Sequence, residues 1–227
     1  MNIIEMQGVK KHYALGSTTV QALKHIDFTV KEGDFLSVVG PSGSGKTTML
    51  NIIGCIDHAT GGTVKIHGTD VTQMTDKQLT NLRLHKIGFI FQTFNLIPVL
   101  TIRENVEFPL LLMKGEKSTK AQIAARVDRA VEEVGLKEYI EHKPYELSGG
   151  QRQRVAIARA LVTKPDIVLA DEPTANLDSE TGRKILELMR ELNDVEKTTF
   201  IFSTHDAEVL KYAKHVVRIK DGMIAEQ

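Results

Sequence analysis

Nine consecutive residues in the first quarter of the chain have the composition and spacing of a phosphate-binding loop. They are Gly40, Pro41, Ser42, Gly43, Ser44, Gly45, Lys46, Thr47 and Thr48. They fit G-x-x-x-x-G-K-S/T, in which glycines let the backbone wrap around phosphates and a following helix adds its positive end. Lys46 is expected to reach the β- and γ-phosphates, and the Thr47 hydroxyl to ligate Mg²⁺. A glycine-rich turn is the simpler alternative, but the flanking β-rich and helix-compatible runs favour phosphate binding.

Two adjacent acids end an apolar run in the second half of the chain. Residues 167–170 are Ile-Val-Leu-Ala, and Asp171 and Glu172 follow them. The carboxyl edge of a parallel sheet is where α/β proteins place their chemistry. Asp171 suits the Mg²⁺ shell, directly or through water, and Glu172 is then free to act as general base. Alone, such a pair is more often a solvated turn; the loop upstream favours the functional interpretation.

A second glycine-containing turn precedes a helical pattern at 156–161. It consists of Ser148, Gly149, Gly150 and Gln151. The start of a helix is a potential anion site because its N–H groups and dipole favour negative charge. In the simpler alternative Ser148 only caps the helix. The residues of this turn leave both interpretations open.

The elements that must position these residues alternate between apolar strands and amphipathic helices. Strands are predicted at 3–7, 25–30, 34–40, 64–66, 87–92, 166–171, 198–203 and 215–220. Helices are predicted at 45–54 and 76–84, and helical spacing of apolar residues recurs at 123–134 and 185–192. The pattern predicts an α/β fold: a P-loop NTPase core with a mainly parallel sheet, an N-terminal antiparallel β portion and an inserted helical lobe.

The helical lobe divides the predicted domain. We expect a single domain over residues 1–227, in which 1–92 and 149–227 form the α/β core and about 93–148 form a helical subdomain. An apolar loop-like segment, 94–100, follows the strand at 87–92. It is either packed inside the helical lobe or reserved for another protein.

Composition and charge disfavour nucleic-acid-binding, disulfide-bonded and membrane-spanning proteins. Lys+Arg and Asp+Glu both number 29, so the formal net charge is zero, which argues weakly against nucleic-acid binding. The single cysteine, Cys55, cannot form an internal disulfide and fits a reducing compartment. Neither a secretory signal nor an apolar run of about 18 residues is apparent, so any membrane role is expected to come through a partner chain.

The three candidate motifs together resemble the ABC-transporter ATPases. Leu147-Ser-Gly-Gly-Gln151 lies about twenty residues before the strand that ends in Asp171-Glu172, with the phosphate loop about a hundred residues earlier. The resemblance covers nearly the whole chain. Within the family, residues 87–110 and 147–179 are most similar to subunits that serve lipoprotein-releasing and macrolide-export permeases.

The resemblance implies roles for four further residues. Gln92 resembles the glutamine that senses Mg²⁺ and water and joins the core to the helical lobe. Asp178 falls in the loop that crosses the dimer seam, and His205 resembles the histidine that contacts the γ-phosphate. Tyr13 resembles the aromatic residue that stacks on adenine. Apart from the resemblance, His205 is more typical of a surface or core histidine, and Tyr13 of a core aromatic.

The resemblance also implies partners. In the family, two chains pack head-to-tail around two ATP molecules, so that Ser148, Gly149 and Gly150 of one chain cover the nucleotide of the other. ATP hydrolysis would then drive a separate membrane permease from the cytoplasmic face of the cell membrane. Export or extraction of a lipophilic or peptide-like substrate is expected from the subgroup.

Three other functions are less consistent with the sequence. An ABC-type ATPase acting on nucleic acid or ribosomes is the main alternative, although such proteins usually carry two cassettes or a long coiled-coil insertion. A signalling GTPase is disfavoured because no Asn-Lys-x-Asp motif occurs and no Asp-x-x-Gly follows the loop. A non-catalytic binding module is disfavoured by the intact Lys46, Asp171, Glu172 and His205.

Overall fold

The computed structural model describes residues 1–16, 18–113 and 118–226, and within them ten strands form one sheet. In spatial order across the sheet the strands are β5 (Thr69–Asp70), β4 (Gly61–Ile66), β1 (Asn2–Leu15), β2 (Thr18–Lys31), β10 (Met223–Glu226), β9 (His215–Lys220), β3 (Phe35–Val39), β8 (Thr199–Thr204), β7 (Ile167–Asp171) and β6 (Ile87–Ile90). The helices are α1 (Lys46–Ile53), α2 (Asp76–Lys86), α3 (Ile102–Leu112), α4 (Lys120–Glu133), α5 (Gly149–Leu161), α6 (Ser179–Glu196) and α7 (Ala207–Leu210). Two short 3₁₀ helices, η1 (Lys137–Tyr139) and η2 (Pro144–Glu146), lie between α4 and α5.

The parallel half of the sheet is built from apolar strands. β9, β3, β8, β7 and β6 pair with one another in parallel register, and every residue of β3 and β8 is buried. Strands covered on both faces are expected to be continuously apolar rather than alternating. β1, β2, β4 and β5 pair antiparallel, so the predicted α/β fold with an antiparallel N-terminal portion is confirmed.

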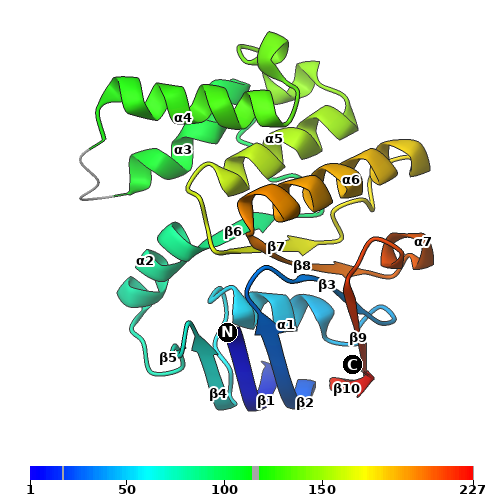
Figure 1. The fold of residues 1–227 in the computed structure, drawn as a ribbon. Helices are drawn as coiled ribbons and strands as arrows, with labels where there is room; N and C mark the ends of the chain where they lie inside the picture. The colour runs from blue at the N-terminus through cyan, green and yellow to red at the C-terminus, as the bar shows by residue number, and fades with distance from the viewer. Residues whose placement is uncertain (17, 114–117, 227) are drawn as a thin grey trace.

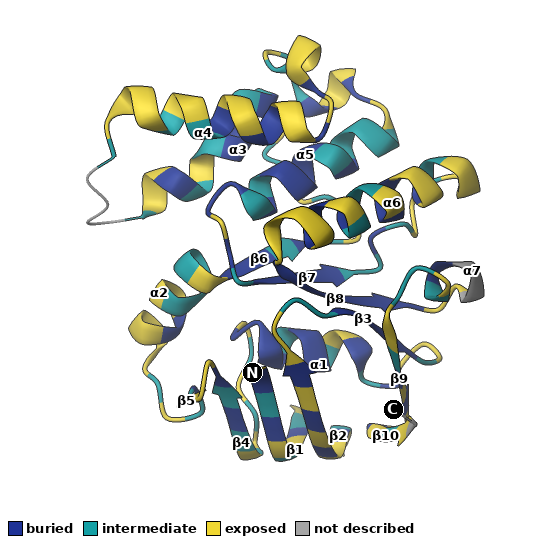
Figure 2. Cartoon of the chain, viewed as in Figure 1, coloured by how far each residue is buried: buried dark blue, intermediate teal, exposed yellow. Residues whose placement is uncertain are grey.

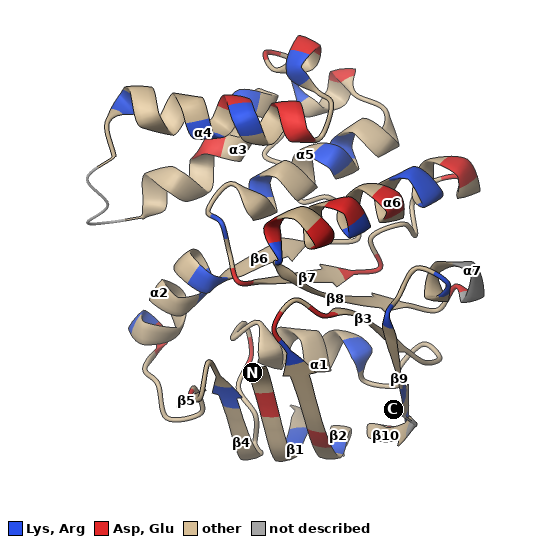
Figure 3. Cartoon of the chain, in the orientation of Figure 1, with Lys and Arg blue, Asp and Glu red and all other residues tan. Residues whose placement is uncertain are grey.

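Two buried clusters hold the layers together. Helix α1 lies between the parallel strands and the antiparallel strands (Figure 1), and its apolar residues join those of both in the first cluster. The second cluster lies on the opposite face of the parallel strands and is shared with α3, α4, α5 and α6. Figure 2 shows the buried strands between these layers and the exposed outer faces of α4 and α6. Basic and acidic residues are interspersed along those two outer faces (Figure 3).

The helices above the sheet begin at well-defined caps. Thr101 and Thr119 each accept a hydrogen bond from a backbone N–H in the first turn, and Glu104 and Gln122 return a bond to the cap residue. Such reciprocal caps satisfy donors that a helix start otherwise leaves free. The predicted helical lobe is present as α3 and α4, which pack on α5; residues 114–117 of that lobe lie outside the described residues.

The hairpin of β1 and β2 is longer than predicted, and β5 and β10 were not predicted. The register of β1 and β2 shifts between Met6 and Val9 and again near Lys11, and these irregularities interrupt the strict alternation that marks a strand. β6 ends at Ile90, so Gln92 lies beyond the strand rather than at its end. Within the described ranges, no helix has both the length and the apolarity to cross a membrane.

A buried asparagine ties the end of α6 to the start of β3. Asn193 is 1% exposed, and its amide nitrogen donates to the carbonyls of Thr198 at 2.7 Å, Gly33 at 3.1 Å and Asp34 at 3.4 Å. Its side-chain oxygen accepts from the Lys214 ammonium at 2.9 Å. The amide therefore satisfies several buried polar groups where three elements meet.

We predict that Asn193→Ala lowers the free energy of unfolding by about 2 kcal/mol, because buried groups lose their partners. Chemical denaturation followed by circular dichroism measures the change. Glu191→Ala, at an exposed position of the same helix, is the matched control and should change stability by less than about 0.5 kcal/mol. Equal stability of the two variants would contradict a structural role for the Asn193 amide.

Candidate functional site

Two of the three predicted motifs, the phosphate loop and the acidic pair, meet at one cavity at the carboxyl ends of β3, β7 and β8. β3 leads into the phosphate loop, β7 ends at Asp171, and His205 follows β8. The cavity has a volume of about 550 Å³. Its lining consists of Val20, Gln21, Ala22, Ser42, Gly43, Gly45, Lys46, Thr47, Thr48, Gln92, Asp171, Glu172 and His205. Because the strands are parallel, their carboxyl ends meet at one edge, and this brings residues far apart in the sequence together.

Lys46 is held inside the loop that precedes it. Its ammonium donates to the carbonyls of Gly40 at 2.8 Å and Pro41 at 3.1 Å, and the residue is only 8% exposed. Among the described residues, no carboxylate lies within ion-pair distance of it. A buried charge without a counter-ion is costly, so this ammonium is suited to an anion in the cavity.

Gly45 allows the loop to turn directly into α1. Its φ is 108°, and a Cβ there would lie 2.7 Å from the Ala22 carbonyl oxygen and 2.8 Å from Leu23 Cδ2. Only glycine fits such a conformation and such a close approach. The first N–H groups of α1 have no partners within the helix and point into the loop, as a phosphate site requires.

Asp171 is bound from two sides by hydroxyl groups. The Thr47 hydroxyl lies 3.0 Å from Asp171 Oδ2 and 3.3 Å from Oδ1, and the Ser203 hydroxyl donates to Oδ1 at 2.5 Å. Thr47 and Asp171, which were predicted to share a metal ion, are thus in direct contact. Mg²⁺ is commonly bound by one or two carboxylates together with substrate phosphates, and this pair provides such oxygen ligands.

Glu172 and His205 form the second pair of the site. His205 Nδ1 lies 2.8 Å from Glu172 Oε1, with the Glu172 side chain 15% exposed and that of His205 68% exposed. Glu172 has a φ of 49°, an unusual conformation for a residue with a side chain. Backbone strain of this kind persists where surrounding contacts fix it, and it concentrates at functional sites.

Gln92 reaches the cavity from the segment that follows β6. Its carbonyl accepts from the Asn176 amide at 2.8 Å. The next residues, Phe94 and Asn95, both have positive φ, and Arg159 of α5 donates to their carbonyls. Burial lowers the pKa of the Arg159 guanidinium. The position of Gln92 therefore depends on contacts from α5 and from the loop before α6.

Several predicted site residues do not line this cavity. Ser148 caps α5: its hydroxyl accepts from the Gln151 N–H at 3.3 Å, and Gln151 Oε1 accepts from the Ser148 N–H at 2.9 Å. Gly149 lies beside Leu177. Asp178 caps α6 by accepting from the Thr181 N–H at 3.0 Å, and hydrogen bonds from Thr181 lower the Asp178 pKa. In a single chain these residues form a surface separate from the phosphate loop.

Three loop residues and Tyr13 also lie outside the lining. Gly40 and Pro41 contribute the carbonyls that hold Lys46, and the Ser44 hydroxyl is buried with no hydrogen-bond partner among the residues that the structure describes.

Tyr13 pairs with Val20 across the β1–β2 hairpin, and Val20 does line the cavity. The Tyr13 hydroxyl donates to Asp57 Oδ2 at 2.6 Å, and burial together with that bond raises the Tyr13 pKa. Lys11 binds the other oxygen of Asp57 at 2.5 Å. Tyr13 is therefore fixed beside the cavity mouth by a charged pair.

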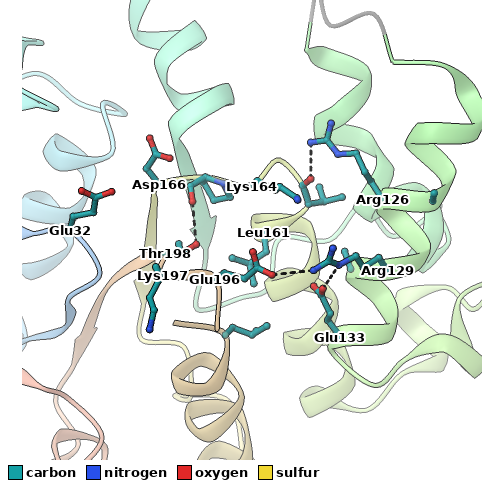
Figure 4. Close-up of a pocket in the computed structure, with 15 residues that line it drawn as sticks. Glu32, Arg126, Arg129, Glu133, Leu161, Lys164, Asp166, Glu196, Lys197 and Thr198 are labelled. Atoms are coloured by element: carbon teal, nitrogen blue, oxygen red, sulfur yellow. Dashed lines mark hydrogen bonds and ion pairs between the residues drawn. The ribbon is translucent and has the colours of Figure 1, made fainter. Parts of the chain in front are cut away.

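Another cavity, of about 520 Å³, lies between α4, the end of α5 and the end of α6 (Figure 4). Arg129 projects into it and forms ion pairs with Glu133 at 2.7 Å and Glu196 at 3.3 Å. It contains neither the phosphate loop nor the acidic pair. Its lining contains four basic and four acidic side chains, so it has no excess positive charge to attract a phosphate.

Sequence reasoning missed Ser203, Asn176 and the Val20–Ala22 segment. Asn176 lies two residues before Asp178 in the loop that resembles the seam-crossing loop, and Val20–Ala22 carries no motif. Ser203 lies two residues before His205 at the end of a predicted strand, which marks it as close to the sheet edge. Its neighbour across the sheet becomes evident only from the strand order, in which β8 lies beside β7.

The residues present fit a nucleotide triphosphate with Mg²⁺. The buried Lys46 ammonium and the unpartnered Ser44 hydroxyl lie in the loop that would hold phosphates, and Thr47 and Asp171 supply hard oxygen ligands. In the part of the chain that is described, no group of three His, Cys, Asp or Glu side chains could hold a metal alone.

Known proteins support this interpretation. A family model described as "ABC transporter" matches residues 23–175. Lipoprotein-releasing system ATP-binding protein LolD 1 of Rhodopseudomonas palustris is 44% identical over 225 residues, which cover 99% of each chain. Macrolide export ATP-binding/permease protein MacB of Syntrophobacter fumaroxidans is 45% identical over 99% of this chain and 31% of its own length.

A solved structure agrees closely with the fold. The ATP-binding cassette MJ0796 of Methanocaldococcus jannaschii, in a dimeric post-hydrolysis state bound to ADP and Pi, superposes with a TM-score of 0.91 at 44% identity. The match covers 98% of this chain and 97% of that one. The resemblance to the lipoprotein-releasing and macrolide-export subgroup is confirmed, and the chain belongs to the ABC transporter family as an ATP-binding, ATP-hydrolysing subunit that uses Mg²⁺.

Proposed function

We propose that two copies of this chain enclose two ATP molecules and that hydrolysis drives a membrane permease. The proposal rests on one observation: the residues expected to contact a nucleotide lie on two separate surfaces of the chain. The phosphate loop, the acidic pair and His205 line one cavity, whereas Ser148 and its neighbours lie elsewhere on the same chain. A second copy related by two-fold symmetry would bring its Ser148 turn over the open side of the nucleotide. The dimeric state of MJ0796 with ADP and Pi supports this arrangement.

We assign the nucleotide contacts to the residues of both surfaces. In the chain that holds the phosphates they are Tyr13, Gly40, Pro41, Ser42, Gly43, Ser44, Gly45, Lys46, Thr47 and Thr48. From the partner copy they are Ser148, Gly149, Gly150, Gln151 and Asp178. Thr47, Gln92 and Asp171 would hold Mg²⁺, which when bound would neutralise charge on the phosphate oxygens.

The catalytic roles fall to four residues. Lys46 stabilises charge on the transferred phosphoryl group, and Glu172 accepts the proton of the attacking water. His205, bound to Glu172, orients that carboxylate and reaches the γ-phosphate, and Gln92 positions the water. Removing the base while keeping its shape should therefore stop hydrolysis without preventing ATP binding.

We predict that Glu172→Gln lowers the rate of ATP hydrolysis by at least about 10³-fold and forms a stable dimer with Mg-ATP. It should remain monomeric with Mg-ADP, because only the γ-phosphate joins both halves of the site. Size-exclusion chromatography with each nucleotide measures the state. The double variant Glu172→Gln with Ser148→Arg is the control and should stay monomeric with ATP. A monomer of Glu172→Gln in saturating Mg-ATP would contradict the enclosed-nucleotide mechanism.

The groove between α2 and α3 is the surface we propose for the permease. A cavity of about 1340 Å³ runs along α2 and β6 and reaches Leu112, and an adjoining cavity of about 330 Å³ includes Phe108. Phe108, Leu111 and Leu112 are 40%, 61% and 50% exposed. Exposed apolar side chains grouped beside a groove mark a binding surface, and an amphipathic helix is the segment that fits it.

Family membership argues for one occupant, a cytoplasmic helix of the permease. MacB is by name an ATP-binding/permease protein. Through such a helix the chain would lie on the cytoplasmic face of the membrane. We also propose that residues 93–148 form a helical subdomain within a single domain, since this part of the chain borders the groove. Leu96, from the apolar segment 94–100, is half-buried in the second cluster, so the exposed α3 residues are better probes of docking.

We predict that Leu112→Glu weakens permease binding by about tenfold or more while the isolated subunit keeps its ATPase rate within about twofold. A charge in the groove must be desolvated when the helix binds. Co-purification with the co-expressed permease subunit measures binding. Val195→Glu replaces an apolar residue that is 69% exposed on α6, away from the groove, and should bind normally. Equal binding by both variants would rule out this groove.

A further inference from the structure

A buried serine at the end of β8 lies between the two acids of the site. β7 and β8 are parallel neighbours, and their register places Asp171 beside Ser203. Side chains alternate along a strand, and Ile201 packs in the first cluster with Leu169 of β7. Ser203 and Asp171 therefore lie on the face that α1 covers, the face from which Thr47 approaches.

The Ser203 hydroxyl makes two different hydrogen bonds there. It donates to Asp171 Oδ1 at 2.5 Å and accepts from the Glu172 N–H at 3.0 Å. The residue is 0% exposed, so water does not replace either bond. A hydroxyl offers one donor and two acceptor positions, and both kinds are used in this arrangement.

These bonds act on residues with different proposed roles. Asp171 would bind Mg²⁺, and its other oxygen contacts Thr47, so Ser203 fixes the plane of the carboxylate from the opposite side. The Glu172 backbone is held at a φ of 49°, and the same N–H also reaches the Ser203 carbonyl at 3.2 Å. That backbone conformation sets the direction in which the Glu172 side chain leaves toward His205.

We propose that Ser203 is a positioning residue that couples the metal-binding carboxylate to the general base. The inference rests on the proposed roles of Asp171 and Glu172. Ser203 does not line the cavity, and it acts by holding two residues that do. Partners that orient metal ligands typically contribute about 10–100-fold to metal affinity or activity.

The chain offers a matched control for this serine. Ser37 of β3 is also 0% exposed and lies beside Phe202 in the register of β3 and β8. Its hydroxyl has no hydrogen-bond partner among the described residues. Ser37→Ala and Ser203→Ala therefore delete the same buried atom from adjacent strands of the sheet, and only the second deletion removes contacts with the acids.

The test compares ADP affinity with Mg²⁺ and with EDTA by isothermal titration calorimetry. The ratio of the two affinities measures what the metal contributes to ADP binding, because the contacts of the phosphate loop contribute to both affinities. We expect Ser203→Ala to reduce this ratio by about tenfold or more while metal-free ADP binds as in the unaltered chain. Ser203→Cys, which keeps nearly the same size but has a weak donor, should also reduce the ratio of the two affinities. Thermal melting confirms that each variant is folded.

Two outcomes would count against different claims. If Ser203→Ala keeps the ratio of the unaltered chain and of Ser37→Ala, then Ser203 has no positioning role. If the unaltered chain binds ADP equally with Mg²⁺ and with EDTA, then the metal assignment of Thr47 and Asp171 fails instead. A general loss of stability would weaken both affinities together and leave the ratio unchanged, which would also overturn the proposal.

Discussion

The buried positive charge of Lys46 is the constraint on which the rest of the site depends. Moving an ammonium out of water costs several kcal/mol even after the protein relaxes, and neutral carbonyls offset only part of that cost. The Gly40 and Pro41 carbonyls hold the ammonium in place, but no described carboxylate neutralises it. A phosphate anion is the partner that completes the arrangement. The loop, the start of α1 and the first cluster, which contains the apolar residues of α1, all keep this charge where an anion can reach it.

The acids of the site line the same cavity as this charge, and hydroxyl groups hold them in place. Asp171 is bound by Thr47 of α1 and by Ser203 of β8, so both the helix and the neighbouring strand fix it. Glu172 is fixed through its backbone and directed toward His205. Catalysis of phosphoryl transfer relies mainly on positioning and electrostatic stabilisation, and each of these contacts serves one of the two. The Ser148 turn lies outside the cavity, and in the proposed dimer the partner's turn would add to that stabilisation.

The motifs that are local in sequence were predictable, because spacing alone decides them. Lys46 and Thr47 follow the glycines of their loop, and Asp171 and Glu172 end a strand whose apolar run is unmistakable. The parallel sheet followed from the alternation of apolar strands and amphipathic helices. By contrast, the contact of Ser203 with Asp171 depends on which strands are neighbours, and no residue pattern states that order. The long β1–β2 hairpin was underestimated because its bulges break the two-residue period.

The roles of Tyr13, Gln92 and His205 came from family resemblance, and the structure adds their surroundings. His205 meets Glu172 directly, whereas Gln92 and Tyr13 are held by Asn176 and Asp57. The Ser148 turn could be located from sequence, but its target could not, since a helix start that caps itself has the same pattern as one that covers a nucleotide. The separation of this turn from the phosphate loop within one chain is the observation behind the proposal that it covers the partner's nucleotide.

Mixing two inactive variants tests the division of the site most directly. Lys46→Ala damages the phosphate loop, and Ser148→Arg places bulk and charge on the surface proposed to cover the partner's nucleotide. A mixed dimer would contain one site with an intact loop and an intact turn, beside one doubly damaged site. If the Ser148 turn covers the partner's nucleotide, ATPase activity should return on mixing, and Ser148→Arg alone should still bind ATP as a monomer. No recovery on mixing, together with lost ATP binding by monomeric Ser148→Arg, would show that the turn acts within its own chain and would contradict the account.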